Sequence, residues 1–147
     1  MNAYQNTYKQ NQVLNASPEQ ILLMLYDGTI LFVRQARVAI EEDDWATRIE
    51  KLGRAINILT ELSGTLDFQG GGDFAENMDS LYWYMIRELT HANARNLAEP
   101  LDNVEAILVD LRDSWARAVE KVRAEGKGAE EAPPQLPPAM AISISSP

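Results

Sequence analysis

The sequence contains no cysteine among its 147 residues and one histidine. The absence of cysteine excludes disulfide bonds, thiol nucleophiles and thiolate metal sites, and it is compatible with a reducing compartment. Basic residues are also scarce, because 13 Lys and Arg stand against 22 Asp and Glu and leave a formal net charge of −9. Without a basic excess to release counterions from phosphates, the chain is a poor candidate for binding nucleic acid or an anionic membrane surface.

Long apolar runs are absent as well. No run approaches the roughly 18 apolar residues of a membrane span, so we expect no direct membrane insertion. The opening stretch MNAYQNTYKQNQ is polar and lacks the apolar centre of a secretory signal, which predicts a cytoplasmic protein. What the sequence does hold is 46% apolar residues, enough for a single domain with one hydrophobic core.

Four segments have the apolar periodicity of amphipathic helices. Ser17, Pro18 and Gln20 form a capping box that predicts the start of a helix running to about Glu42. The other helices are expected to start after Asp43 or Asp44, at Asp73 behind three glycines, and at Asp102 behind Pro100, with a stop at Gly126. Helices of about 20 residues joined by short connections favour an all-α fold, an antiparallel up-down four-helix bundle.

Each later helix has an apolar face that we expect to enter the core. The face of the second helix consists of Trp45, Ile49, Leu52, Ile56, Leu59 and Leu66. The face of the third consists of Phe74, Met78, Leu81, Met85, Leu89 and Ala92. The face of the fourth consists of Val104, Leu108, Leu111, Trp115, Ala118 and Val122. Trp83 falls on the polar side of the third helix, where it is either a contact anchor or a chance exposure.

The predicted bundle domain, residues 17–125, is flanked by two segments of different composition. Residues 1–16 hold Tyr4 and Tyr8 among polar side chains, and they are either a removable lid over a groove or a frayed terminus. Residues 126–147 include four prolines in the six positions 133–138, which excludes helix there and predicts a disordered tail. Pro134 and Pro137 form a P-x-x-P match, which is either a ligand motif or part of a solvated terminus.

The sequence gives little support for an enzyme. Glu88 and His91 have the E-x-x-H spacing of di-iron bundle proteins, but such sites use two copies plus inward glutamates, and this chain has one copy beside the predicted core face. The triple glycine has no lysine and hydroxyl residue after it, so it is no phosphate-binding loop. We therefore expect no catalytic residues, no metal and no cofactor.

The first helix has more apolar surface than a core face needs. Ile21, Leu25, Phe32, Ala36 and Ala39 would suffice, yet a second stripe lies on another side of the helix. The second stripe consists of Leu23, Tyr26, Ile30 and Val33, and the second helix has a smaller one in Ala55, Ile58 and Leu62. Such a helix is buried all round, covered by the N-terminal segment, or offered to a partner.

Several short stretches together resemble the flagellar export chaperones that hold flagellin in the cytosol. The stretch from Ser17 to Gly28, SPEQILLMLYDG, preceded by Tyr4, is similar to the opening of that family. Further matching pieces follow in the same order: Glu61, Leu62 with Thr65, Leu66, Asp67; Gly71, Gly72; Leu81, Tyr82 with Tyr84, Met85, Ile86; Ala92, Asn93; Leu111, Arg112 with Trp115. The resemblance spans about residues 4 to 120. Trp83 stands where the family often has a polar residue, so any contact role for it is peculiar to this chain, and the proline-rich tail has no family counterpart.

This resemblance implies a helical bundle that binds the C-terminal segment of flagellin, prevents premature polymerisation and delivers the subunit to the flagellar export gate. It also implies that the N-terminal segment can occupy part of the flagellin-binding surface. Together with the apolar stripes, it gives a predicted client-binding set of Tyr4, Leu23, Tyr26, Ile30, Val33, Ile58 and Leu62. The alternative is a non-enzymatic scaffold or adaptor in which the extra stripe forms a homodimer, and a weak homodimer is also compatible with the chaperone.

Overall fold

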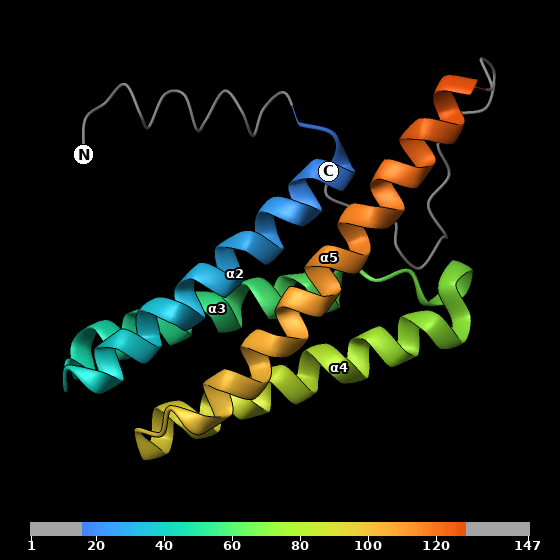
Figure 1. Ribbon diagram of the computed structural model, residues 1–147. Helices are drawn as coiled ribbons and strands as arrows, with labels where there is room; N and C mark the ends of the chain where they lie inside the picture. Colours follow the sequence, from blue (N-terminus) through green and yellow to red (C-terminus); the bar gives the residue numbers. More distant parts are fainter. Residues whose placement is uncertain (1–15, 129–147) are drawn as a thin grey trace.

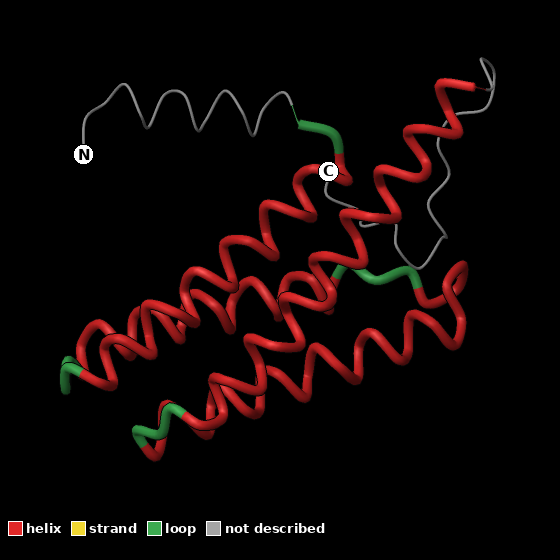
Figure 2. Tube along the Cα trace, viewed as in Figure 1, coloured by secondary structure: helices red, strands yellow, loops and turns green. Residues whose placement is uncertain are grey.

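The computed structural model describes residues 16–128. Four α-helices account for nearly all of this part: α2 (Pro18–Glu41), α3 (Trp45–Gly64), α4 (Phe68–Arg95) and α5 (Glu99–Gly128). No strand occurs within residues 16–128, as the tube in Figure 2 shows, so the all-α prediction is confirmed.

The helices form an antiparallel four-helix bundle. α2 packs against α3 and α5, and α4 packs against the same two helices, so that α2 and α4 lie diagonally across the core. Successive helices run in opposite directions, and α5 continues past the ends of its neighbours (Figure 1). Short turns force this arrangement, because each is too short to cross the bundle. The predicted up-down topology is confirmed.

The start of α2 follows the predicted capping box. The Ser17 hydroxyl accepts a hydrogen bond from the Gln20 N–H, and the Gln20 side chain accepts one from the Ser17 N–H. These two bonds satisfy backbone donors that would otherwise lack partners at the helix start. Asp44 caps α3 in a similar way by accepting from the Thr47 N–H. Hydrogen bonding with the Thr47 side chain and with its N–H lowers the pKa of Asp44.

α4 begins at Phe68, earlier than the predicted start at Asp73, but its long part does start directly behind the glycines, as predicted, because Gly72 interrupts the helix. Asp67 accepts a hydrogen bond from the Gly70 N–H and caps a first turn that includes two of the three glycines. The break falls within the helix, at Gly72, whose φ of 51° and ψ of −128° are non-helical. A residue with a side chain is strained at such a φ, so the glycine permits the kink.

The boundaries of α5 also differ from those predicted. The helix begins at Glu99 rather than Asp102, with Pro100 in the first turn. Proline is compatible with that position, because the N–H it lacks would have no helical partner there. The other end is Gly128, two residues beyond the predicted stop.

The core confirms much of the predicted apolar pattern but shifts the faces of α3 and α4. Trp45, Ile49 and Phe74 were expected to be buried, and they are 67%, 45% and 44% exposed. Heptad spacing drifts around a helix of 3.6 residues per turn, so neighbouring apolar positions face the core instead. Those positions are Ala55 and Leu62 on α3 and Ala75, Tyr82 and Ile86 on α4.

Candidate client-binding surface

The second apolar stripe of α2 faces the core. Tyr26, Ile30 and Val33 are at most 6% exposed, and Leu62 of α3 is 1% exposed, so of the alternatives for the stripe the structure shows burial. These four members of the predicted client-binding set lie in the core. The buried stripe runs through Leu22, Tyr26, Val33 and Ala36 at spacings that keep it on one side of the helix. Leu25 and Phe32, which were expected to fill the core, lie at its edges and are partly buried.

Leu23 and Ile58 are the two predicted contacts that remain partly exposed, and they lie on different flanks of α2. Leu23 is one turn before Asp27, which pairs with Arg112 of α5. Ile58 of α3 lies near Gly28, since a Cβ atom built there would be 3.9 Å from the Ile58 Cδ1. The structure therefore does not join them into one surface. Tyr4 lies outside the described residues.

Buried polar contacts link the interior of three helices. The Tyr26 hydroxyl on α2 is 2.6 Å from the Tyr82 hydroxyl on α4, and it accepts a hydrogen bond of 3.1 Å from the Trp115 indole N–H on α5. All three side chains are almost completely buried. Burial raises the pKa of Tyr26 to about 12, although its two hydrogen bonds oppose the shift. The pKa of Tyr82 is raised by burial and by the neighbouring Tyr26.

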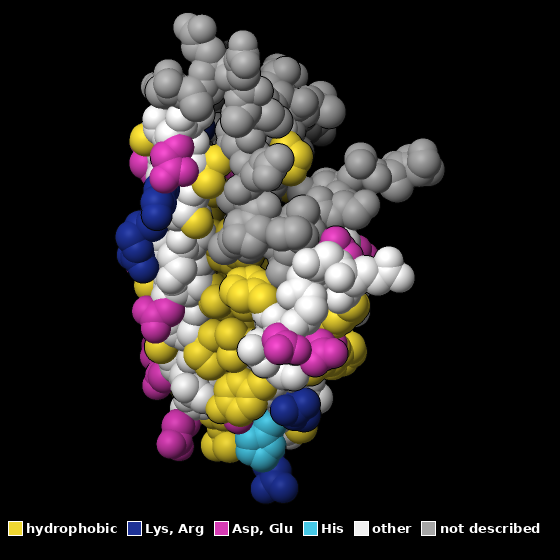
Figure 3. Space-filling view, turned by 90° about the vertical axis from the view of Figure 1, so that its right-hand side faces the viewer, with side chains coloured by type: hydrophobic (Ala, Val, Ile, Leu, Met, Phe, Trp, Pro, Cys, Tyr) yellow, Lys and Arg dark blue, Asp and Glu magenta, His cyan; other side chains and the backbone are white. Residues whose placement is uncertain are grey.

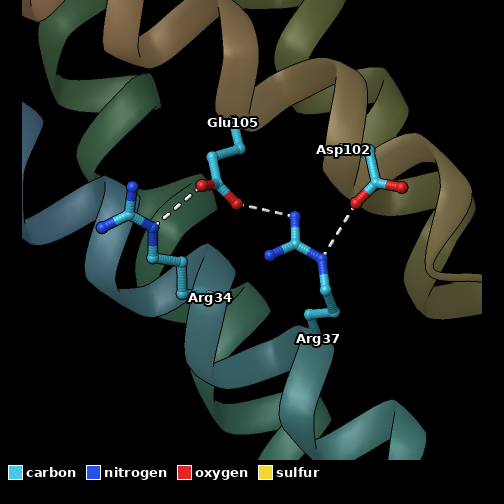
Figure 4. A network of polar contacts seen from close by, with 4 residues as sticks. All are labelled: Arg34, Arg37, Asp102 and Glu105. Carbon is cyan, nitrogen blue, oxygen red and sulfur yellow. Dashed lines mark hydrogen bonds and ion pairs between the residues drawn. The ribbon is translucent and has the colours of Figure 1, made fainter.

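Ion pairs close the flank between α2 and α5. Glu105 lies between two arginines, with Arg34 at 2.9 Å and Arg37 at 2.7 Å, and Arg37 also contacts Asp102 at 2.9 Å (Figure 4). Burial raises the pKa of Glu105, but hydrogen bonds and charge from the two arginines outweigh it and lower the value overall. A shallow hollow of about 500 Å³ beside Arg37, Asp102 and Glu105 has these paired charges as its walls.

α3 also makes polar contacts with each of its two neighbours, α2 and α4. Lys51 and Arg54 place their cations 5.6 and 5.8 Å from the ring centre of Phe32 on α2. On the other flank, the Arg48 guanidinium donates to the side chains of Asn93 and Asn96 of α4, at 3.1 and 2.6 Å. These contacts fix α3 against both neighbours.

The flank between α4 and α5 has little polar contact. Among residues 16–128 no ion pair joins these two helices, and one surface hydrogen bond does, from the Asn103 amide to the Tyr84 hydroxyl at 2.6 Å. The helices meet near their turn and diverge toward the start of α4 (Figure 1). Apolar side chains follow the contact along both helices. We name this set the α4–α5 strip: Phe74, Leu81 and Tyr84 of α4, with Ile107 and Leu111 of α5.

The α4–α5 strip leaves apolar surface in contact with solvent. Phe74 is 44% exposed, and the other four members are partly buried against the core. Figure 3 views the molecule from the right-hand side of Figure 1 and shows hydrophobic side chains gathered in a column above the single histidine. Contiguous apolar surface of this kind marks interaction sites in soluble proteins.

The sequence does not reveal the α4–α5 strip, because the spacing of Phe74, Leu81 and Leu111 is that of a core face. Leu81 and Leu111 do pack partly against the core, whereas Phe74 is exposed. No sequence signal sets Ile107 apart. Trp83, in contrast, is 42% exposed on α4, so its predicted position outside the core is confirmed.

Glu88 and His91 gain no further ligands. His91 is exposed, and residues 16–128 contain no group of three or more His, Asp or Glu side chains arranged to hold a metal ion. Within the same range, no helix combines the length and apolar character needed to cross a membrane.

Comparison with known proteins places the chain in a family. The family model described as "Flagellar protein FliS" matches residues 1–122. The flagellar secretion chaperone FliS of Bacillus subtilis is 39% identical over 121 residues, which cover 82% of this chain and 90% of that protein. Its namesakes from Salmonella typhimurium and Vibrio cholerae are 38% and 33% identical, covering 81% and 78% of this chain and 89% and 85% of theirs. The chain belongs to the FliS family of flagellar proteins.

Proposed function

We propose that this protein is a non-enzymatic chaperone that binds the C-terminal segment of flagellin in the cytoplasm. In this role it prevents premature polymerisation and delivers the segment to a component of the flagellar export gate. Membership of the FliS family, whose curated members are flagellar secretion chaperones, supports the general role. The observation that carries the binding proposal is the α4–α5 strip, a set of apolar side chains along two helices that diverge and that one surface hydrogen bond joins within residues 16–128.

The α4–α5 strip has the chemistry needed to hold an amphipathic helix. Phe74 and Leu81 are two turns apart on α4, and Ile107 and Leu111 are about one turn apart on α5, so the two diverging helices offer rows of apolar contacts rather than a single point. A client helix can lay its apolar face on such a row. A free terminal segment cannot bury enough apolar area to fold alone, so we expect it to fold as it binds.

The predicted client-binding residues keep a place in this proposal. Leu23 and Ile58, on the two flanks of α2, are partly exposed and available as additional contacts, so that a long client segment passes around the bundle. The buried Tyr26, Ile30, Val33 and Leu62 support the surface from below and do not touch the client. Tyr4 remains a predicted contact or lid residue. The net charge of −9 limits self-association of a bundle that exposes apolar side chains.

Titration calorimetry tests the function. The full chain is titrated with a peptide that covers about the last 40 residues of flagellin, at several temperatures, with a scrambled peptide as control. We expect saturable binding with a large negative heat-capacity change, because apolar surface is buried as the peptide folds. No heat from the native peptide would contradict the proposal. A stable dimer that does not respond to the peptide, measured by light scattering, would support the scaffold alternative.

A further inference from the structure

The proline-rich segment is the one sequence motif that the proposed function does not use. The family match ends at residue 122, and the segment at residues 133–138, Pro-Pro-Gln-Leu-Pro-Pro, lies beyond it. Proline-rich segments of this type form polyproline helices that bind surfaces lined with aromatic side chains. An aromatic surface within reach of the segment is therefore its natural partner.

The direction of α5 determines where the segment starts. α4 and α5 are antiparallel, and Asn103 contacts Tyr84. Because both helices rise by about 1.5 Å per residue, Phe74 is level with the region of Asp113. From there α5 continues to Gly128, about 22 Å past the level of Phe74.

Two aromatic side chains are exposed at this end of the bundle. Phe68 is 47% exposed and Phe74 is 44% exposed, and they lie on either side of the kink at Gly72. Phe74 is the first residue of the α4–α5 strip, and Leu81 follows two turns later on the same side of α4. This end therefore combines exposed rings with an adjoining aliphatic surface, where α4 and α5 are furthest apart (Figure 1).

The segment is long enough to reach this surface. Leu136 is eight positions after Gly128, and an extended chain spans about 3.3 Å per residue, or about 26 Å in total. That distance exceeds the roughly 22 Å from the end of α5 back to the level of Phe74. Leu136, the apolar residue between the proline pairs, can therefore reach the rings.

We propose that residues 133–138 dock on Phe68 and Phe74 of the same chain and compete with the client for the start of the α4–α5 strip. The competition rests on the proposed function, whereas the docking does not. A short tether gives the segment a millimolar effective concentration at the site, so weak contacts suffice. The segment thus covers exposed apolar surface in the free chaperone and leaves when a tighter-binding client arrives.

The absence of cysteine makes the docking directly measurable. Spin labels are attached to the full chain at Asn77→Cys, an exposed position between Phe74 and Leu81, and at Ala139→Cys, directly after the prolines. Without any client, we expect a narrow distance distribution between the labels. Adding Pro134→Ala, Leu136→Asp and Pro137→Ala should broaden it. A broad distribution in the unmodified segment would overturn the proposal.

Controls separate docking from other causes. Ser145→Ala with Ser146→Ala alters the same tail outside the motif and should leave the distribution narrow, and Phe68→Ala with Phe74→Ala should broaden it. Dilution with unlabelled protein should not change the signal, since loss of the signal would mean that the segment binds a second copy and would contradict docking within one chain. In the final step, saturating client peptide should broaden the distribution, and client binding that leaves it narrow would overturn the competition.

Discussion

Tyr26 of α2 and Tyr82 of α4 share a hydrogen bond of 2.6 Å across the interior of the bundle. The two helices lie diagonally opposite each other, so this contact joins elements that do not form a neighbouring pair. Trp115 of α5 donates to the same Tyr26 oxygen and extends the link to a third helix. Tyr26 is thus the shared partner, and its loss leaves two buried groups without hydrogen bonds.

Tyr26 has two hydrogen-bond partners and Tyr82 has one, so removing either hydroxyl should lower the free energy of unfolding by a different amount. Tyr26→Phe leaves the Tyr82 hydroxyl and the Trp115 N–H unpaired, and we expect the free energy of unfolding to fall by about 2–3 kcal/mol. Tyr82→Phe still leaves Tyr26 bonded to Trp115, so its cost should be about 1 kcal/mol. Urea denaturation followed by circular dichroism measures both values. Equal costs, or a larger cost for Tyr82→Phe, would contradict the central role of Tyr26.

The raised pKa of Tyr26 predicts sensitivity to alkali. Its value is about 12 in the folded chain against 10.0 for an ordinary tyrosine, so folding favours the neutral phenol. The stabilisation is fully present below pH 10 and declines as the pH rises toward 12. We expect Tyr26→Phe to lose less stability than the unmodified chain between about pH 9 and about pH 11. Parallel losses in denaturation experiments would show that Tyr26 ionises as freely in the fold as in the unfolded chain.

The ion pairs of Glu105 predict a dependence on acid. Its pKa is lowered below the ordinary 4.5, so the stabilisation is present above that pH and is lost as the pH falls through the folded value. At neutral pH, Glu105→Gln should lower the free energy of unfolding by about 0.5–1 kcal/mol, because the pairs are partly exposed. The difference between the two proteins should shrink in acid. Urea denaturation of both proteins at neutral pH and at a pH well below 4.5 measures this difference in stability. An unchanged difference would mean that the charge of Glu105 contributes nothing to stability.

Two glycines provide a matched test of the kink in α4. Gly72 has a φ of 51°, so Gly72→Ala should destabilise the fold by about 1–2 kcal/mol through backbone strain. Gly53 lies inside α3 with open space around an added Cβ atom, and Gly53→Ala should stabilise the fold by about 0.5–1 kcal/mol. Thermal denaturation of both variants measures whether the melting temperature falls for Gly72→Ala and rises for Gly53→Ala. A harmless Gly72→Ala would mean that α4 can straighten at this point.

The helices could be predicted from the sequence because the signals that define them lie within a few neighbouring residues. The capping box at Ser17 and the apolar periodicity identified the helices, because both act within a few residues. Asp67 was overlooked as a cap because the glycines after it are poor helix formers, whereas its side chain stabilises a turn that includes two of them.

The candidate site was harder to predict, since burial depends on how the helices pack. α2 has apolar residues on more than one side, and periodicity alone does not say whether Tyr26 or Phe32 faces the core. The exposure of Phe74 similarly follows from the divergence of α4 and α5, a relation between segments far apart in the sequence. Ion pairs such as Arg37 with Glu105 depend on the same register, so the sequence could not show which flank holds them.

The most direct test of the binding surface compares two exposed apolar residues. Phe74 lies on the α4–α5 strip and is 44% exposed, and Leu31 lies outside it on α2 and is 52% exposed. Binding of the flagellin C-terminal peptide is measured by calorimetry for Phe74→Asp, Leu31→Asp and the unmodified chain, after circular dichroism has shown equal helicity. We predict that Phe74→Asp weakens binding by at least about tenfold, or about 1.4 kcal/mol, and that Leu31→Asp binds as the unmodified chain does. Equal affinities for all three proteins, or a loss confined to Leu31→Asp, would contradict the assignment of the α4–α5 strip as the client-binding surface.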